Sequence, residues 1–206
     1  LQGGFETTMS EHRGWHSRGY LPHRDEPGLI QAITFHLADS LPLRLLYPDL
    51  PPSEEQEAYR EKVQEWLDAG WGGCLLSDPR AAAIVEDLLL DRDGKSYVLL
   101  AWVVMPNHVH VLIEIIEGYS LSRILQSWKV RTARECNRVL GTSGRFWEPE
   151  YYDRYIRNER HLQNAILYIH SNPVVAGLVS EPRLWPFGSA RRGHADGGLW
   201  ERGESR

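Results

Sequence analysis

The sequence predicts an α+β domain, in which a ferredoxin-like antiparallel sheet carries helices packed on one of its faces. Four stretches have the composition of strands: residues 31–37, 97–104, 108–114 and 151–156. Helix-like patterns follow the first and the third of them and also the last. The 206 residues are 42% hydrophobic and 25% charged, which suits a single globular domain with a core of ordinary size.

The first strand is predicted from the alternating stretch QAITFHL at 31–37. The apolar run 97–104 and the strand-like run 108–114 are separated only by the short break Met105-Pro106-Asn107. Such a short connection favours an antiparallel hairpin.

Helices are predicted where apolar residues recur every three or four positions. One lies in the acidic segment after Ser53 and ends near Gly70, and a second runs over 79–91. A third is long and starts at Ser120, which can cap it, and Gly141 ends it. A fourth follows Asn158, which can cap it, and Pro173 is expected to end or kink it. Its apolar side is formed by Leu162, Ala165, Ile166 and Ile169.

These patterns divide the chain into an extended N-terminal arm (1–30), one domain (31–185) and a tail (186–206) that we expect to be flexible. The domain carries an acidic helical insertion at about 49–93 that could cover, gate or dimerise it. The two cysteines, Cys74 and Cys136, lack a CxxC spacing and are expected to be reduced thiols.

Charge is spread unevenly along the chain. The net charge is -5, which argues against indiscriminate binding to nucleic acid, because phosphate contacts normally leave a basic footprint. However, residues 49–93 hold twelve acidic and four basic residues, whereas 120–160 hold nine basic and five acidic ones, so a local basic face remains. Apolar runs are far shorter than the roughly 20 residues that a bilayer requires, and we expect a cytoplasmic protein without membrane contact.

His108 and His110 are the first candidates for a functional site. On a strand their side chains lie on one face, while Val109 and Val111 point into the core. Two imidazoles at this spacing can bind one metal ion, which could polarise a phosphate. An HxH pair is nevertheless a weak signal by itself, and two ordinary histidines on a solvated face remain the alternative.

Tyr168 and Asn172 lie one helical turn apart, to the side of the apolar stripe of their helix, and could face one cleft. A phenol can attack a phosphate, and a nearby cation favours its ionised form. The amide oxygen of Asn172 could complete a metal shell, unless the following Pro173 takes Asn172 out of helical register. The alternative is a half-buried tyrosine and a helix-end asparagine.

Together these residues carry a family resemblance. WVVMPNHVHVL (102–112), YIHSNPVVAGL (168–178) and WPFGSA (185–190) occur in this order, with RGWHSRGYLPH (13–23) and YYDRYIR (151–157) as further matches. The chain resembles the IS200-like transposases of the single-tyrosine HUH class, and within them the REP-associated branch.

The resemblance implies an HUH endonuclease fold in which His108 and His110, with Asn172 as third ligand, bind Mg²⁺ or Mn²⁺. It also implies that Tyr168 attacks single-stranded DNA to give a 5′-phosphotyrosine and a free 3′-hydroxyl, which allows later strand transfer. The partner would be a palindromic, REP-like hairpin with a short flanking guide sequence, bound by a nucleoid-associated monomer or homodimer. Rival nucleophiles are Tyr151, Tyr152 and Tyr155, and His170 is a less favoured ligand than Asn172.

Candidate DNA contacts come from the basic region and the arm: Arg18, Tyr20, Lys129, Arg131, Arg134, Arg154 and Arg157. For each, a solvated surface position is an equally good interpretation, so only a cluster in space would be meaningful. Two other functions compete with the transposase hypothesis. One is a domesticated, non-catalytic hairpin-binding protein, and the other is a phosphodiesterase that activates water.

Overall fold

A computed structural model describes residues 14–17, 22–25, 28–42 and 54–192. Its main sheet has four antiparallel strands among these residues, in the order β4-β5-β3-β6. Their bounds are Ile30–His36 (β3), Tyr97–Val104 (β4), His108–Ile115 (β5) and Tyr152–Tyr155 (β6). The expected hairpin of β4 and β5 is present, and β5 also pairs with β3 in the middle of the sheet.

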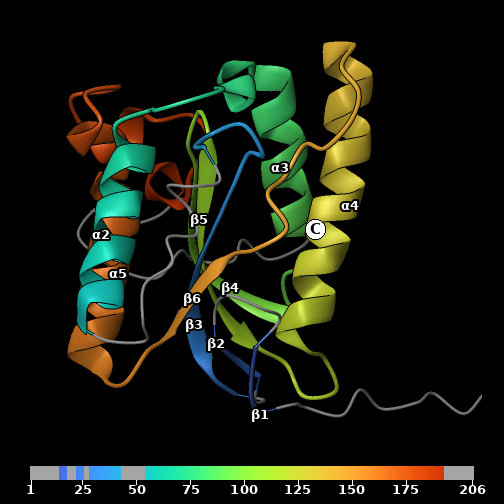
Figure 1. Ribbon diagram of the computed structural model, residues 1–206. Helices are drawn as coiled ribbons and strands as arrows, with labels where there is room; N and C mark the ends of the chain where they lie inside the picture. Colours follow the sequence, from blue (N-terminus) through green and yellow to red (C-terminus); the bar gives the residue numbers. More distant parts are fainter. Residues whose placement is uncertain (1–13, 18–21, 26–27, 43–53, 193–206) are drawn as a thin grey trace, which may run out of the picture.

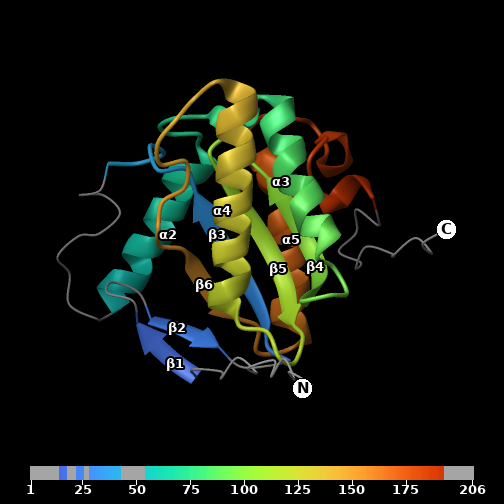
Figure 2. The same cartoon turned by 90° about the vertical axis from the view of Figure 1, so that its right-hand side faces the viewer.

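The helices of the described part of the chain are α2 (Glu54–Asp68), α3 (Pro79–Asp91), α4 (Leu121–Leu140) and α5 (Glu159–Val175). One short 3-10 helix, η1 (Leu75–Ser77), lies between α2 and α3. Two more, η2 (Pro182–Leu184) and η3 (Ser189–Arg191), come after α5. Helices α3 and α4 cover one face of the sheet, and α5 covers the other, with α2 beside it (Figures 1 and 2).

The α+β class is thus confirmed, but helices lie on both faces of the sheet, whereas one face was expected. The reason is the composition of the central strands, which are buried on both sides. In β5, Val109 and Val111 pack in the core under α3 and α4, and Leu112 packs on the opposite side with Ile166 and Ile169 of α5. Two apolar faces must both be removed from water, which requires helices on each.

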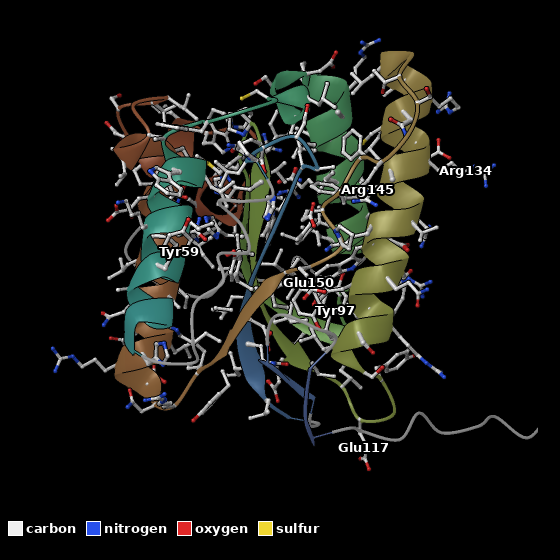
Figure 3. The ribbon with its side chains drawn as sticks, viewed as in Figure 1. Tyr59, Tyr97, Glu117, Arg134, Arg145 and Glu150 are labelled. Atoms are coloured by element: carbon white, nitrogen blue, oxygen red, sulfur yellow. The ribbon has the colours of Figure 1, made fainter. Side chains whose placement is uncertain are left out.

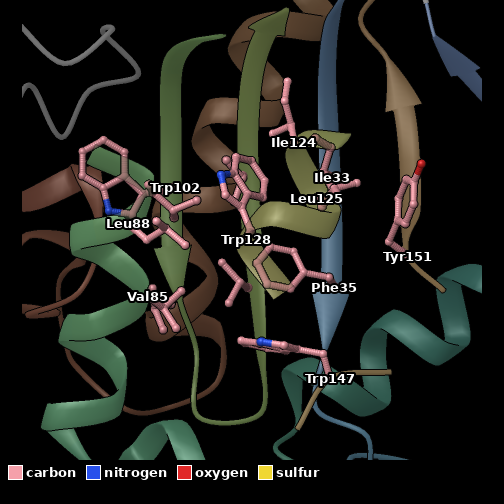
Figure 4. Packing of buried hydrophobic residues seen from close by; sticks show 14 of the residues in the cluster. Ile33, Phe35, Val85, Leu88, Trp102, Ile124, Leu125, Trp128, Trp147 and Tyr151 are labelled. Carbon is pink, nitrogen blue, oxygen red and sulfur yellow. The ribbon is translucent and has the colours of Figure 1, made fainter. Parts of the chain in front are cut away.

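The core under α3 and α4 is rich in aromatic side chains, and its indole groups and the Tyr97 hydroxyl have hydrogen-bond acceptors (Figure 4). The Trp128 indole donates to the Tyr97 hydroxyl at 3.2 Å, and that hydroxyl donates to the Leu89 carbonyl at 2.7 Å. The Trp102 indole donates to the buried Glu86 carboxylate at 2.9 Å. These bonds remove the cost of burying Tyr and Trp polar groups and fix α3 against the sheet.

Two helix ends differ from what the sequence indicated. Asn158 caps α5 as expected, because its side-chain oxygen accepts from the His161 amide at 2.9 Å, but Ser120 makes no capping bond to α4. Pro173 neither ends nor displaces α5, which continues to Val175. It lies in the last turn, where little helix remains to be disrupted, and Asn172 keeps its helical register.

The flanks of the domain also contain structure. Within the expected arm, Gly14–Ser17 (β1) and Pro22–Asp25 (β2) form an antiparallel hairpin. At the other end, Ser189 is buried beyond the expected boundary at 185, and its hydroxyl accepts from the Trp102 amide at 3.0 Å. The packed domain therefore extends at least to Ala190, which is also buried. Within the described residues, no helix has the length and apolar character needed to cross a bilayer.

The turn after α2 packs closely against the end of β3. Gly72 has φ +81°, and a Cβ there would overlap the Ser40 carbonyl. The neighbouring Gly73 amide donates to the Asp39 carbonyl at 3.1 Å. This close approach fixes where α2 ends relative to the sheet.

We expect Gly72→Ala to lower the free energy of unfolding by at least ~3 kcal/mol, since backbone strain and overlap add. Gly70→Ala is the matched control, because Gly70 has a similar φ of +76° but open space around it. It should cost only about 1–2 kcal/mol. Urea denaturation measures both, and equal losses would show that the contact with Ser40 is unimportant.

His36 predicts a pH dependence of stability. Burial lowers its pKa from 6.5 to about 4, despite a hydrogen bond to the Leu37 carbonyl. As the pH falls, His36 therefore becomes protonated near pH 6.5 in the unfolded chain but only near pH 4 in the folded chain. The contribution of His36 to the free energy of unfolding is fully present above pH 6.5. It falls by about 3 kcal/mol as the pH decreases from 6.5 to about 4.

The measurement is urea denaturation at pH 7 and pH 5 for the wild type and His36→Gln. The variant should lose less stability on acidification than the wild type. His161→Gln, at a half-buried position on α5, is the control and should keep most of the wild-type pH dependence. An identical pH dependence for His36→Gln and the wild type would contradict the assignment.

Candidate metal centre

His108 and His110 begin β5 and lie on the sheet face that α5 covers, as the strand alternation predicted. Both are buried, and their Nε2 atoms are 2.9 Å apart. Val109 and Val111, on the opposite side of the strand, belong to the main core. The sheet therefore aims two imidazoles at one point.

The outer nitrogen of each ring is held by a neighbour. Asn107 donates through Nδ2 to the Leu67 and Trp71 carbonyls at 3.0 and 2.9 Å, which orients its Oδ1 to accept from His108 Nδ1 at 2.7 Å. His110 Nδ1 lies 2.9 Å from the Thr34 hydroxyl. With Nδ1 protonated in this way, His108 directs the Nε2 lone pair at the shared point.

The electrostatics of the site favour neutral ligands. Burial, and then the neighbouring His110, lower the pKa of His108 to about 4. A metal ion binds the unprotonated imidazole, so His108 is already in its ligand form at neutral pH.

A third group comes from α2, and the sequence did not point to it. Asp68 Oδ1 lies 3.2 Å from His108 Nε2 and 3.4 Å from His110 Nε2. Gln64, one turn earlier, donates to the same oxygen at 2.8 Å. Burial would raise the pKa of Asp68, but the hydrogen bonds with both imidazoles hold it well below its usual range. Asp68, His108 and His110 together form a group that could hold a metal ion.

Tyr168 and Asn172 reach this group from α5. The Tyr168 hydroxyl donates to Asp68 Oδ2 at 2.7 Å, and its ring packs edge-on against His110 with centroids 5.2 Å apart. Burial, followed by the charge of Asp68, raises the pKa of Tyr168. The Tyr168 side chain is nevertheless 42% exposed, so it can be reached from solvent.

Asn172 supports the presence of an ion. Its Nδ2 lies 3.3 Å from His110 Nε2, while its Oδ1 is buried and has no hydrogen-bond partner in the described part of the chain. A buried amide oxygen without a donor is costly, and a half-turn of the amide, which exchanges Oδ1 and Nδ2, would present the oxygen to a cation at this point. The convergence of two imidazoles and one carboxylate, with the Asn172 amide beside them, fits Mg²⁺ or Mn²⁺.

The rival residues are placed elsewhere. Tyr151 is buried in the main core, Tyr152 stacks on His36, and Tyr155 lies under Arg157. His170 turns away from the centre, because its Nε2 bonds the Ser189 hydroxyl at 2.9 Å.

The predicted DNA contacts do not form one cluster. Lys129 donates to the carbonyls of residues 148, 149 and 150 at 2.7–2.9 Å, which gives it a structural role that competes with phosphate binding. Arg131 and Arg134 are exposed on α4, and Arg134 points away from the side that carries α2 and α5 (Figure 3). Arg154 and Arg157 are exposed near the start of α5, whereas Arg18 and Tyr20 lie outside the described residues.

Comparison with known proteins shows which transposases the chain is similar to. Residues 81–172 match the family model described as "Transposase IS200 like", a range that includes both histidines, Tyr168 and Asn172. This part of the chain is therefore similar to the IS200-like transposases, in agreement with the resemblance inferred from the motifs. Helix α2 precedes the matched range, so Asp68 lies outside it.

The particular relatives are REP-associated tyrosine transposases. One from Escherichia coli is 28% identical over 106 residues, which cover 52% of this chain and 62% of that protein. A putative one from Haemophilus influenzae is 25% identical over 103 residues, covering 45% and 58% respectively. The chain thus aligns with less than two thirds of either relative.

A solved structure shares the fold. It is described as a REP-associated tyrosine transposase bound to a REP hairpin, and it matches with a TM-score of 0.58 and 20% identity. The match covers 95% of this chain and 93% of that one.

We expect Asn107→Ala to destabilise the protein by about 2–4 kcal/mol, since it removes a donor from the Leu67 and Trp71 carbonyls and leaves the buried His108 N–H without its acceptor. Asn137→Ala is the matched control, because the Asn137 amide donates to the Gly144 carbonyl in an exposed position. That control should cost less than about 1 kcal/mol. Thermal and urea unfolding compare the two, and equal losses would refute the bracing role of Asn107.

Proposed function

We propose that this protein is a metal-dependent endonuclease and strand transferase of single-stranded DNA, with Tyr168 as its nucleophile. The observation that carries the proposal is that the Tyr168 hydroxyl shares one carboxylate with the paired histidines, at 2.7 Å from Asp68 Oδ2. A half-exposed phenol beside a group of metal ligands is the arrangement that a covalent attack on phosphate requires.

His108, His110 and an oxygen from Asn172 or Asp68 would hold Mg²⁺ or Mn²⁺, which when bound supplies a Lewis acid that polarises the scissile phosphate. The residues of the chain account for the remaining steps. The sheet fixes both imidazoles through Asn107 and Thr34, and α5 presents the Tyr168 oxygen beside them. Attack forms a bond between that oxygen and phosphorus, and the bond from phosphorus to the 3′-oxygen breaks.

The products would be a 5′-phosphotyrosine and a 3′-oxygen that takes up a proton to become a hydroxyl. The phenolic proton is directed at Asp68 Oδ2 before attack. Attack by another 3′-hydroxyl on the phosphotyrosine reverses these bond changes and joins two strands. The bond energy is kept in the intermediate, so strand transfer needs no nucleotide cofactor.

For the DNA partner we propose a hairpin formed by a REP-like palindrome, with a short flanking guide sequence. Support comes from the names of the relatives and from the description of the structural neighbour as bound to a REP hairpin. Arg154 and Arg157 precede α5, the helix that carries Tyr168, and both are exposed. Among the described residues they are our candidates for a phosphate contact near that helix. Arg18 and Tyr20 remain candidates in the N-terminal segment.

We expect the wild type, incubated with Mn²⁺ and a single-stranded oligonucleotide that carries a REP hairpin and its flank, to form a covalent adduct. Denaturing gels resolve the adduct by its reduced mobility. Tyr168→Phe should abolish it, because phenylalanine has no nucleophilic oxygen. Tyr119→Phe is the matched control, since Tyr119 is also 42% exposed but precedes α4, and it should leave the adduct unchanged.

Other outcomes point to the competing functions. Adduct formation by Tyr168→Phe would show that another residue is the nucleophile. Cleavage by the wild type without an adduct would indicate a phosphodiesterase that activates water. Tight hairpin binding with no cleavage under any divalent metal would indicate a domesticated binding protein.

A further inference from the structure

We propose that Asp68, which the insertion helix α2 contributes, is a metal ligand through Oδ1 and positions the Tyr168 hydroxyl through Oδ2. The inference rests on the proposed function and deepens it, because it assigns a role to a residue outside the matched transposase range. The acidic insertion would then be part of the site, and not only a cover for it.

The positions of the candidate ligand atoms support the first role. His108 Nε2, His110 Nε2 and Asp68 Oδ1 are separated by 2.9, 3.2 and 3.4 Å. Adjacent ligands of an octahedral ion at 2.0–2.1 Å lie about 3 Å apart. The three atoms therefore already have the spacing of neighbouring ligands, with little movement required.

The charge of Asp68 also supports its role as a metal ligand. Its side chain is only 14% exposed, and the basic side chains within ion-pair distance of it in the described part of the chain are the two histidines, with no lysine or arginine among them. A shielded carboxylate is unfavourable unless a cation accompanies it. A divalent ion between Asp68 and the two imidazoles would supply that cation.

Asp68 is held in place by contacts of α2 with the strand that carries the histidines. Asn107, directly before His108, binds the Leu67 carbonyl next to Asp68 and the Trp71 carbonyl just beyond it. Gln64 donates to Oδ1 from one turn earlier in the helix. The end of α2 and the start of β5 thus form one braced unit, which orients the carboxylate.

The second oxygen serves the nucleophile. Oδ2 accepts from the Tyr168 hydroxyl at 2.7 Å, while Oδ1 faces the imidazoles. One rigid carboxylate therefore fixes the distance between the candidate ion and the attacking oxygen. An amide at this position would replace one of the two oxygens by an NH2 group, which neither binds a cation nor accepts the hydrogen bond of the phenol.

The test uses the full chain and measures Mn²⁺ binding by calorimetry and by electron paramagnetic resonance, in the absence of DNA. We expect Asp68→Asn to weaken Mn²⁺ binding at least tenfold. Glu65→Gln removes the same charge from an exposed position on the same helix and should stay within twofold of the wild type. Affinity of Asp68→Asn within twofold of the wild type would overturn the assignment as a ligand.

His110→Ala separates this inference from the proposed function. If the wild type binds no Mn²⁺, or if His110→Ala binds it as well as the wild type does, the proposed metal centre fails. If His110→Ala abolishes binding but Asp68→Asn matches the wild type, only the role of Asp68 fails.

Asp68→Cys provides a second test that does not depend on a loss of binding. A thiolate at a ligand position should turn the site toward soft ions and give a Cd²⁺–thiolate charge-transfer band that the wild type lacks. Absence of the new band in folded Asp68→Cys would contradict the ligand role.

The positioning role is tested at saturating Mn²⁺, where the rate of adduct formation by Asp68→Asn should still be at least tenfold below the wild type. A wild-type rate under these conditions would show that Oδ2 does not position Tyr168.

Discussion

The structure around the site depends on one constraint, which is that two imidazole nitrogens 2.9 Å apart are buried with their lone pairs converging. Such an arrangement is unfavourable unless a proton or a metal ion lies between the nitrogens and nearby oxygens share the charge. Asp68 supplies a carboxylate, and Asn172 supplies a buried oxygen that has no other partner among the described residues. Each of these groups comes from a different helix, so the site exists only when both helices are docked on the sheet.

The two faces of the sheet have different roles. One carries the main hydrophobic core, and the other carries the candidate metal centre. The face under α3 and α4 is filled by aromatic and aliphatic side chains, and the Tyr97 hydroxyl and the Trp102 indole among them donate hydrogen bonds within the core. The opposite face carries a smaller apolar cluster under α5, and the histidines lie beside it where α2 and α5 meet the sheet. The large core holds the backbone of β5 in place, and the smaller one leaves Tyr168 half exposed. A rigid scaffold next to an accessible phenol suits the covalent attack that we propose for Tyr168.

Much of the fold followed from local patterns, whereas the packing of the layers did not. The β4–β5 hairpin and the cap at Asn158 were predicted because each depends on residues close in sequence. The expectation that helices cover one face was wrong, because the apolar runs of β4 and β5 do not reveal on which side each helix packs. Lys129 was interpreted as a phosphate contact from its charge, yet it binds three carbonyls in the segment before β6. These carbonyls lie near Lys129 only because the segment between α4 and β6 runs back alongside α4.

The sequence by itself determined that His108 and His110 share one face of a strand and that Tyr168 and Asn172 share one side of a helix, since both follow from backbone periodicity. It also indicated the transposase family through the order of these motifs. Only the tertiary structure decided that Asp68 joins them. One acidic residue among the twelve between positions 49 and 93 has no local feature that marks it as a ligand, although Gln64 and Asp68 do flank the buried Val63 and Leu67. Its role arises from a contact across 100 residues of chain, between the end of α2 and the hydroxyl of Tyr168, and such a contact is set by packing and not by periodicity.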